Sequence, residues 1–132
     1  MSHASVKSNL PGPALPFIAG IFAWCIPGAG HWIIGERKRA AVIFVSLTIA
    51  FVIGIFLGSI AVIEIKSPWF YAQILFSPIA AYIGHLSGSV LHLESFGRPR
   101  EIGEIYTGIA GMMNLLCIVN AVYLAHKKKE SV

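Results

Sequence analysis

Long apolar segments alternate with short polar ones along this chain. The apolar segments cover about residues 14–35, 40–63, 69–93 and 105–125, and none of them contains Lys, Arg, Asp or Glu. Each exceeds twenty residues, which lets an α-helix cross a hydrocarbon core of about 30 Å. An ionisable side chain at mid-membrane costs roughly 3 kcal/mol or more, so the lack of charge indicates membrane spans. The pattern predicts an all-α, multi-pass protein of the cell membrane, with four transmembrane helices arranged as two helical hairpins.

Polar tails flank the predicted transmembrane domain, which covers residues 14–125. Residues 1–13 form a polar N-terminal tail that breaks at Pro11-Gly12-Pro13, and residues 126–132 form a basic C-terminal tail. The first apolar segment is too long and too aromatic for a signal peptide. We therefore expect this segment to be retained as the first span.

Composition supports a lipid environment and argues against nucleic acid as a partner. The chain of 132 residues is 56% hydrophobic and 12% charged, whereas a soluble domain is about 25% charged. Ten basic residues oppose six acidic ones, and basic clusters beside apolar spans typically meet lipid headgroups. The candidates for contact with a headgroup or with a charged partner are Arg37, Lys38, Arg39, Arg98 and Arg100.

The orientation in the membrane stays open at this stage. Four spans would place both tails and the 64–68 turn on one side, and segments 36–39 and 94–104 on the other. Five basic residues then fall on each side. The first span favours a cytoplasmic 36–39 hairpin, whereas the C-terminal lysines favour the reverse.

Small residues form stripes on the predicted helices. Lipid supplies no hydrophobic drive between helices, so close backbone approach through small side chains is what joins them. The stripes predict contacts between spans, or with another membrane protein subunit. The residues assigned to these contacts are Gly28, Gly30, Gly35, Gly54, Gly58, Gly84, Gly88, Gly111 and Asn114.

A glycine-rich motif, Pro27-Gly28-x-Gly30-His31-x-x-x-Gly35, closes the first apolar segment and runs into the basic cluster. This motif resembles a family of small uncharacterised bacterial multi-pass membrane proteins, and is more distantly similar to the two-transmembrane-helix domain. The later run from Gly103 to Leu116 resembles the closing span of the same family. Relatives often have tyrosine where this chain has Ile33, so no role for that hydroxyl carries over. The resemblance implies the multi-pass fold and brings no activity.

Few side chains in the sequence suggest chemistry. With four spans, His31 and His92 fall near one interface, where two imidazoles could bind a metal or act as axial ligands of a haem. The chain has no HxxxH, HExxH or CxxC spacing and no Gly-x-Ser-x-Gly elbow. We therefore expect no catalytic residues and no bound cofactor, with metal or haem at His31 and His92 as the alternative.

These observations lead to a functional hypothesis. We expect a non-catalytic accessory or structural subunit that packs its glycine-rich helix faces within a larger membrane protein complex. The alternative is a stand-alone membrane protein that binds a lipid headgroup, a metal or a haem at the interface of His31 and His92. Both hypotheses place the protein among membrane lipids.

Overall fold

The computed structural model describes residues 14–90 and 97–131, and these residues form an all-α architecture, as predicted. The predicted polar tail at 1–13 lies outside the described residues. Six α-helices, a 3₁₀ turn (η1) and a π turn (η2) make up the described chain. In chain order they are α1 (Leu15–Cys25), α2 (Ala29–Ile34), α3 (Arg37–Gly58), η1 (Ile60–Val62), α4 (Trp69–Ile74), α5 (Pro78–His85), η2 (Leu86–Val90) and α6 (Arg98–Glu130).

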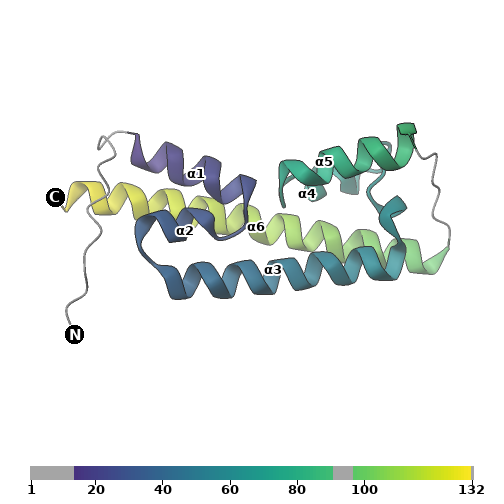
Figure 1. The fold of residues 1–132 in the computed structure, drawn as a ribbon, viewed down its shortest axis with the longest axis horizontal. Coiled ribbons are helices and arrows are strands. Elements are labelled where there is room, and N and C mark those ends of the chain that lie inside the picture. Colours follow the sequence, from purple (N-terminus) through teal and green to yellow (C-terminus); the bar gives the residue numbers. More distant parts are fainter. Residues whose placement is uncertain (1–13, 91–96, 132) are drawn as a thin grey trace.

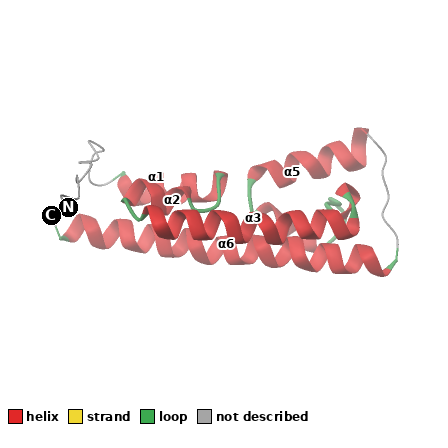
Figure 2. Ribbon diagram, turned by 60° about the horizontal axis from the view of Figure 1, so that its bottom comes forward, coloured by secondary structure: helices red, strands yellow, loops and turns green. Residues whose placement is uncertain are grey.

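Two long helices, α3 and α6, run side by side in opposite directions along the molecule (Figure 1, Figure 2). They contain 22 and 33 residues, so each is about 33 Å long or longer at 1.5 Å per residue. Helix α3 covers most of the predicted 40–63 span, and α6 contains the whole of 105–125. Among the described helices, these two are long and apolar enough to cross a membrane.

The segment 14–35, predicted as one span, is divided into two helices. Helix α1 ends at Cys25, Ile26 is extended, and Gly28 has a φ of 86°. Pro27 disfavours the helical conformation in the residue before it, and glycine adopts a positive φ without steric cost. The chain therefore reverses, and α2 runs back beside α1 (Figure 1). We call α1 and α2 the first hairpin.

The segment predicted as the third span is divided in the same way. Helix α4 ends at Ile74, and Ser77 is extended with a φ of −168°. The Ser77 hydroxyl accepts a hydrogen bond from the backbone nitrogen of Ile79 at 3.3 Å, and Pro78 occupies the first position of α5, where its missing N–H costs nothing. We call α4 and α5 the second hairpin. The structure thus shows two long helices and two hairpins, and it does not show four spans.

The tips of the two hairpins meet near the middle of the long helices (Figure 1). The indole nitrogen of Trp24 donates to the carbonyl oxygen of Ile74 at 3.0 Å. The hydroxyl of Ser77 donates to the carbonyl oxygen of Cys25 at 2.8 Å. These two hydrogen bonds join the tip of one hairpin to the tip of the other.

The ends of the molecule differ from those expected for four spans. The ammonium group of Lys128 donates to the carbonyl oxygen of Ile34 at 2.8 Å, so the C-terminal basic segment lies beside the end of α2. At the opposite end, Arg100 pairs with Glu64 at 2.6 Å and with Glu104 at 3.0 Å. The predicted grouping of 36–39 with 94–104 is wrong for the described residues. Each hairpin returns the chain to the end of the molecule from which it started. Segment 36–39 therefore lies at the same end as the C-terminal basic segment, and the 64–68 turn lies at the same end as Arg100.

Candidate functional site

A buried asparagine joins the two hairpin tips. The side-chain amide nitrogen of Asn114 lies 3.2, 3.0 and 2.9 Å from the carbonyl oxygens of Ala23, Leu75 and Phe76, and its two N–H groups donate to these three oxygens, so one N–H is shared. These carbonyls lie where α1 and α4 end, and the last carbonyls of a helix have no partner within it. Asn114 is fully buried. Sequence analysis assigned it to helix packing, and the structure gives it the more specific role of closing two broken helices.

A second buried polar pair lies under the second hairpin. The Gln73 amide donates to the Thr107 hydroxyl at 2.8 Å and to the carbonyl oxygen of Val62 at 3.3 Å. Thr107 in turn donates to the carbonyl oxygen of Gly103 at 2.8 Å. Gln73 was missed by sequence reasoning. Its signal was available, since it is an amide inside an otherwise apolar run.

Most of the glycines assigned to packing lie against other parts of the same chain. A methyl group added at Gly54 would lie 2.6 Å from a Thr107 side-chain carbon, and one at Gly30 would lie 2.6 Å from the Ala19 carbonyl oxygen. Similar crowding holds at other positions, whereas Gly35 and Gly88 have open space around them. The remaining crowded positions from the predicted set are Gly28, Gly58, Gly84 and Gly111.

His31 lines a cavity between α2, α3 and α6. Its ring is fully buried, and its Nε2 lies 3.1 Å from the amide nitrogen of Asn120. The cavity has a volume of about 400 Å³, and Lys38 and Arg39 also line it. His92 lies outside the described residues. Among residues 14–90 and 97–131, no three His, Cys, Asp or Glu side chains gather where a metal ion could bind.

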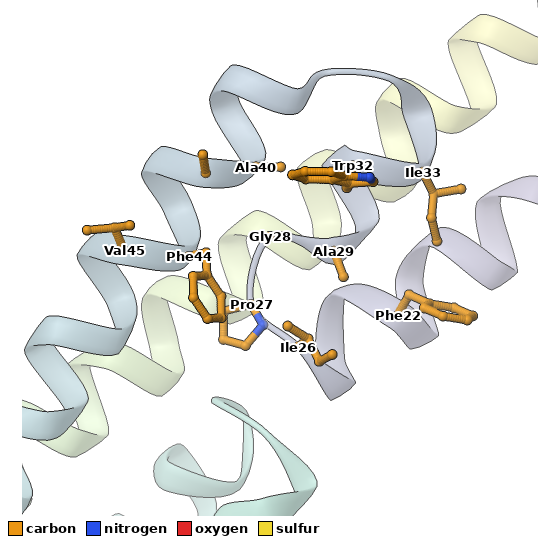
Figure 3. A pocket seen from close by; sticks show the side chains of 11 residues that line it. Phe22, Ile26, Pro27, Gly28, Ala29, Trp32, Ile33, Ala40, Phe44 and Val45 are labelled. Carbon is orange, nitrogen blue, oxygen red and sulfur yellow. The ribbon is translucent and has the colours of Figure 1, made fainter. Parts of the chain in front are cut away.

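An apolar groove of about 470 Å³ opens between the first hairpin and α3 (Figure 3). Its buried floor is formed by Pro27, Gly28 and Ala40. A methyl group on Gly28 would lie 2.5 Å from the Ala40 carbonyl oxygen, so the absence of a side chain brings the hairpin against α3. The other lining residues are Phe22, Ile26, Ala29, Trp32, Ile33, Ala41, Phe44 and Val45.

The walls of the groove are apolar side chains that other parts of the chain leave uncovered. Phe22, Ile26 and Val45 are 50%, 52% and 52% exposed, and Figure 3 shows Phe22 on α1, and Ile26 just after α1, opposite Phe44 and Val45 on α3. A concave, largely apolar site of several hundred Å³ is typical of small-ligand pockets. The arrangement can hold an apolar chain and offers no group for covalent chemistry.

A cation lies beside one of the residues that line the groove. Trp32 lines the groove and is 57% exposed, and the guanidinium carbon of Arg37 lies 5.8 Å from the centre of its ring. That distance is within the range of a cation–π interaction. Arg98 is exposed at the opposite end of the bundle, where Arg100 is paired with Glu64 and Glu104. The five predicted basic contact residues therefore divide between two ends.

Comparison with known proteins gives a family match. A family model described as a family of unknown function (DUF6677) matches residues 18–131. No curated protein and no solved structure matches the chain. The matched range contains both long helices and every residue that lines the groove.

Proposed function

The chain belongs to a family of unknown function, DUF6677, and we propose that it is a non-catalytic integral membrane protein that binds a lipid acyl chain in the groove between the first hairpin and α3. The observation that carries this proposal is the groove itself. It is apolar, it is open on one side, and it ends beside a tryptophan and an arginine. These are the features of a site that takes a hydrocarbon chain from the surrounding bilayer.

In this proposal α3 and α6 cross the membrane, and each hairpin enters it from one side and returns. Backbone that leaves a helix at membrane depth is tolerated where protein covers it and satisfies its polar groups. Asn114, Ser77 and Trp24 supply hydrogen bonds at the two hairpin tips. Large apolar side chains also face outward on the long helices, with Phe56 87% and Leu116 70% exposed.

In this arrangement the two sides no longer carry equal numbers of basic residues. Among the described residues, six Lys or Arg lie at the end that holds segment 36–39 and the end of α6, whereas three lie at the opposite end. Cytoplasmic segments near membrane helices carry an excess of Lys and Arg. We therefore place the end with Arg37 on the cytoplasmic side.

Lipid binding can be tested by a substitution that fills the groove with a larger side chain. Ala41 lines the groove and is exposed, so Ala41→Phe adds bulk there without crowding the core. The full chain is purified in mild detergent, and native mass spectrometry measures the retained phospholipid. We expect about tenfold less retained lipid in the variant, which corresponds to about 1.4 kcal/mol of lost binding and is within the cost of overpacking.

The matched control is Val52→Phe. Val52 is on the same helix and 55% exposed, but it does not line the groove. This variant should retain lipid like the wild type. Equal lipid retention by the wild type and Ala41→Phe, or an equal loss in Val52→Phe, would rule out the groove as the binding site.

An accessory subunit of a larger complex remains the second proposal, supported by a different surface. Gly54 and Gly84 pack against other residues of this chain, so the helix surfaces around them are not open to another subunit. Helix α5 packs less closely on α3 and α6 than the other helices do and leans away from them (Figure 2), leaving Ile79 and Tyr82 62% and 68% exposed. Co-purification with larger subunits that Tyr82→Ala abolishes would support this role, and migration of the wild type as a lone chain would oppose it.

A further inference from the structure

We infer that the lipid held in the groove is an anionic phospholipid, with its phosphate against Arg37 and one acyl chain along the groove. This inference rests on the proposed function, because it names the class of ligand for the same site. The first observation is the position of Arg37, Lys38 and Arg39 on the first turn of α3.

The positions along α3 place Arg37 on the face of the groove. Ala40, Ala41, Phe44 and Val45 line the groove, and they lie three, four, seven and eight residues after Arg37. Residues at those spacings share one helical face. Arg37 therefore stands at the end of the groove, one turn from its first lining residues.

The two neighbouring cations face elsewhere. Lys38 and Arg39 line the separate cavity that contains His31, and Arg39 pairs with Glu36 at 2.9 Å. Within the described residues, Arg37 has no carboxylate partner, and its contact is the ring of Trp32. Of the three consecutive basic residues, Arg37 therefore lies beside the groove, and the other two line the cavity that contains His31.

The chemistry of Arg37 suits a phosphate diester, above all one whose headgroup carries no cation of its own. A guanidinium group presents a planar fork of N–H donors that binds phosphate with two hydrogen bonds. Stacking against an aromatic ring leaves the edge of that fork open to a ligand. Tryptophan is also typical of the membrane interface, where headgroups lie. An apolar groove that ends in a free guanidinium is therefore complementary to a molecule with a hydrocarbon chain and a negatively charged head.

The test measures headgroup preference separately from chain binding. The full-length protein in mild detergent receives equal amounts of phosphatidylglycerol and phosphatidylcholine with identical acyl chains, and native mass spectrometry counts each bound lipid. We expect the wild type to prefer phosphatidylglycerol about fivefold at low salt, the factor that one basic residue gives near an anionic surface. The preference should weaken as salt rises.

The deciding variant is Arg37→Gln, and Lys38→Gln is its control with the same loss of charge one residue away. Arg37→Gln should bind the two lipids about equally, because it retains less phosphatidylglycerol than the wild type and about the same amount of phosphatidylcholine. Lys38→Gln should keep the fivefold preference. Arg37→Lys keeps the charge but loses the planar fork, so its preference should fall between the other two.

The outcomes separate this inference from the proposed function. An unchanged preference in Arg37→Gln, or an equal loss in both glutamine variants, would overturn the assignment to Arg37 while leaving chain binding intact. Absence of retained lipid in the wild type would instead overturn the proposed function. Capture of another protein segment by the groove, seen as a dimer or complex that Ala41→Phe disrupts, would also count against a lipid.

Discussion

The two hairpins are built from the same plan but are stabilised in different ways. The first hairpin packs through small side chains, with Ala19 and Ala23 against Ala121 and Ala125 of α6. The second hairpin also has a close small-residue contact, between Ala72 and Gly111 of α6, but adds large side chains, and the rings of Phe51 and Phe76 stack with centroids 4.0 Å apart. The first hairpin packs closely against both α3 and α6, whereas in the second α4 packs closely on α6 and α5 reaches the core only through side chains such as Ala80.

This difference explains where the groove lies. Small side chains bring α1 close to α6, so the hairpin lies deep, and Gly28 brings its turn against α3. The larger side chains of this region, including Phe22 and Phe44, are left on the outer side and line an open groove. In the second hairpin the aromatic side chain of Phe76 turns inward and fills the space itself. The same break in a helix thus gives an open site in one half and a filled core in the other.

If α3 and α6 cross the membrane as proposed, the largest expected effect is on which side of the membrane each hairpin opens. In a background with Cys25→Ala and Cys117→Ala, single cysteines replace Lys38, Lys66 and Lys128. Lys38→Cys and Lys128→Cys should react with an impermeant maleimide from one side, and Lys66→Cys from the other only, because each hairpin returns to its own end. Labelling in intact and permeabilised cells gives an all-or-none result.

The four-span arrangement makes the opposite prediction for these cysteines. It would place Lys66 with Lys128 and separate both from Lys38. That labelling pattern would show that α1–α2 or α4–α5 crosses the membrane instead of returning, and it would remove the comparison between two hairpins.

A smaller effect is expected from Asn114→Leu, which tests whether the two hairpins depend on one another. The substitution removes the donor to three carbonyls, and unsatisfied backbone groups in an apolar environment cost about 1–3 kcal/mol each. We expect a loss of about 3 kcal/mol in the free energy of unfolding, with faster amide exchange in both hairpins. Met113→Leu, at an exposed neighbouring position, is the control. Faster exchange in only one hairpin would show that the halves are stabilised independently.

Much of the helical content follows from the sequence, but the breaks do not. The uncharged runs at 40–63 and 105–125 correspond to α3 and α6, because long apolar segments without ionisable groups leave few alternatives to helix. Pro27 by itself allows either a kinked span or a reversal. The reversal is stabilised by Asn114, whose amide reaches Ala23 across 91 positions of sequence. Such a distant contact leaves no mark on the local pattern.

The site was even less predictable than the fold. Sequence analysis chose Arg37, Lys38 and Arg39 as one basic cluster, and only the start of α3 at Arg37 shows which of them faces the groove. The lining residues are ordinary apolar side chains of a predicted span, so composition gives them no distinction. The concave shape arises because the hairpin ends halfway along α3. His31 was selected for ligand binding, which stays a prediction; the structure adds that its Nε2 lies 3.1 Å from the amide nitrogen of Asn120.

The smallest expected effects come from one phenylalanine in each half, and together they measure the contrast between filled core and open groove. Phe76 is 9% exposed and Phe44 is 45% exposed. Phe76→Ala leaves a cavity beside Phe51, so we expect the free energy of unfolding to fall by about 2 kcal/mol. The loss is smaller than in a soluble core because, in a membrane, lipid surrounds the phenylalanine ring in the unfolded state as well. Phe44→Ala should change stability by about 0.5 kcal/mol or less but should lower lipid retention. Thermal unfolding in detergent and native mass spectrometry on the same samples give both quantities. If Phe44→Ala destabilised the chain as much as Phe76→Ala and left lipid retention unchanged, the groove would be part of the core, and the two halves would not differ in the way argued above.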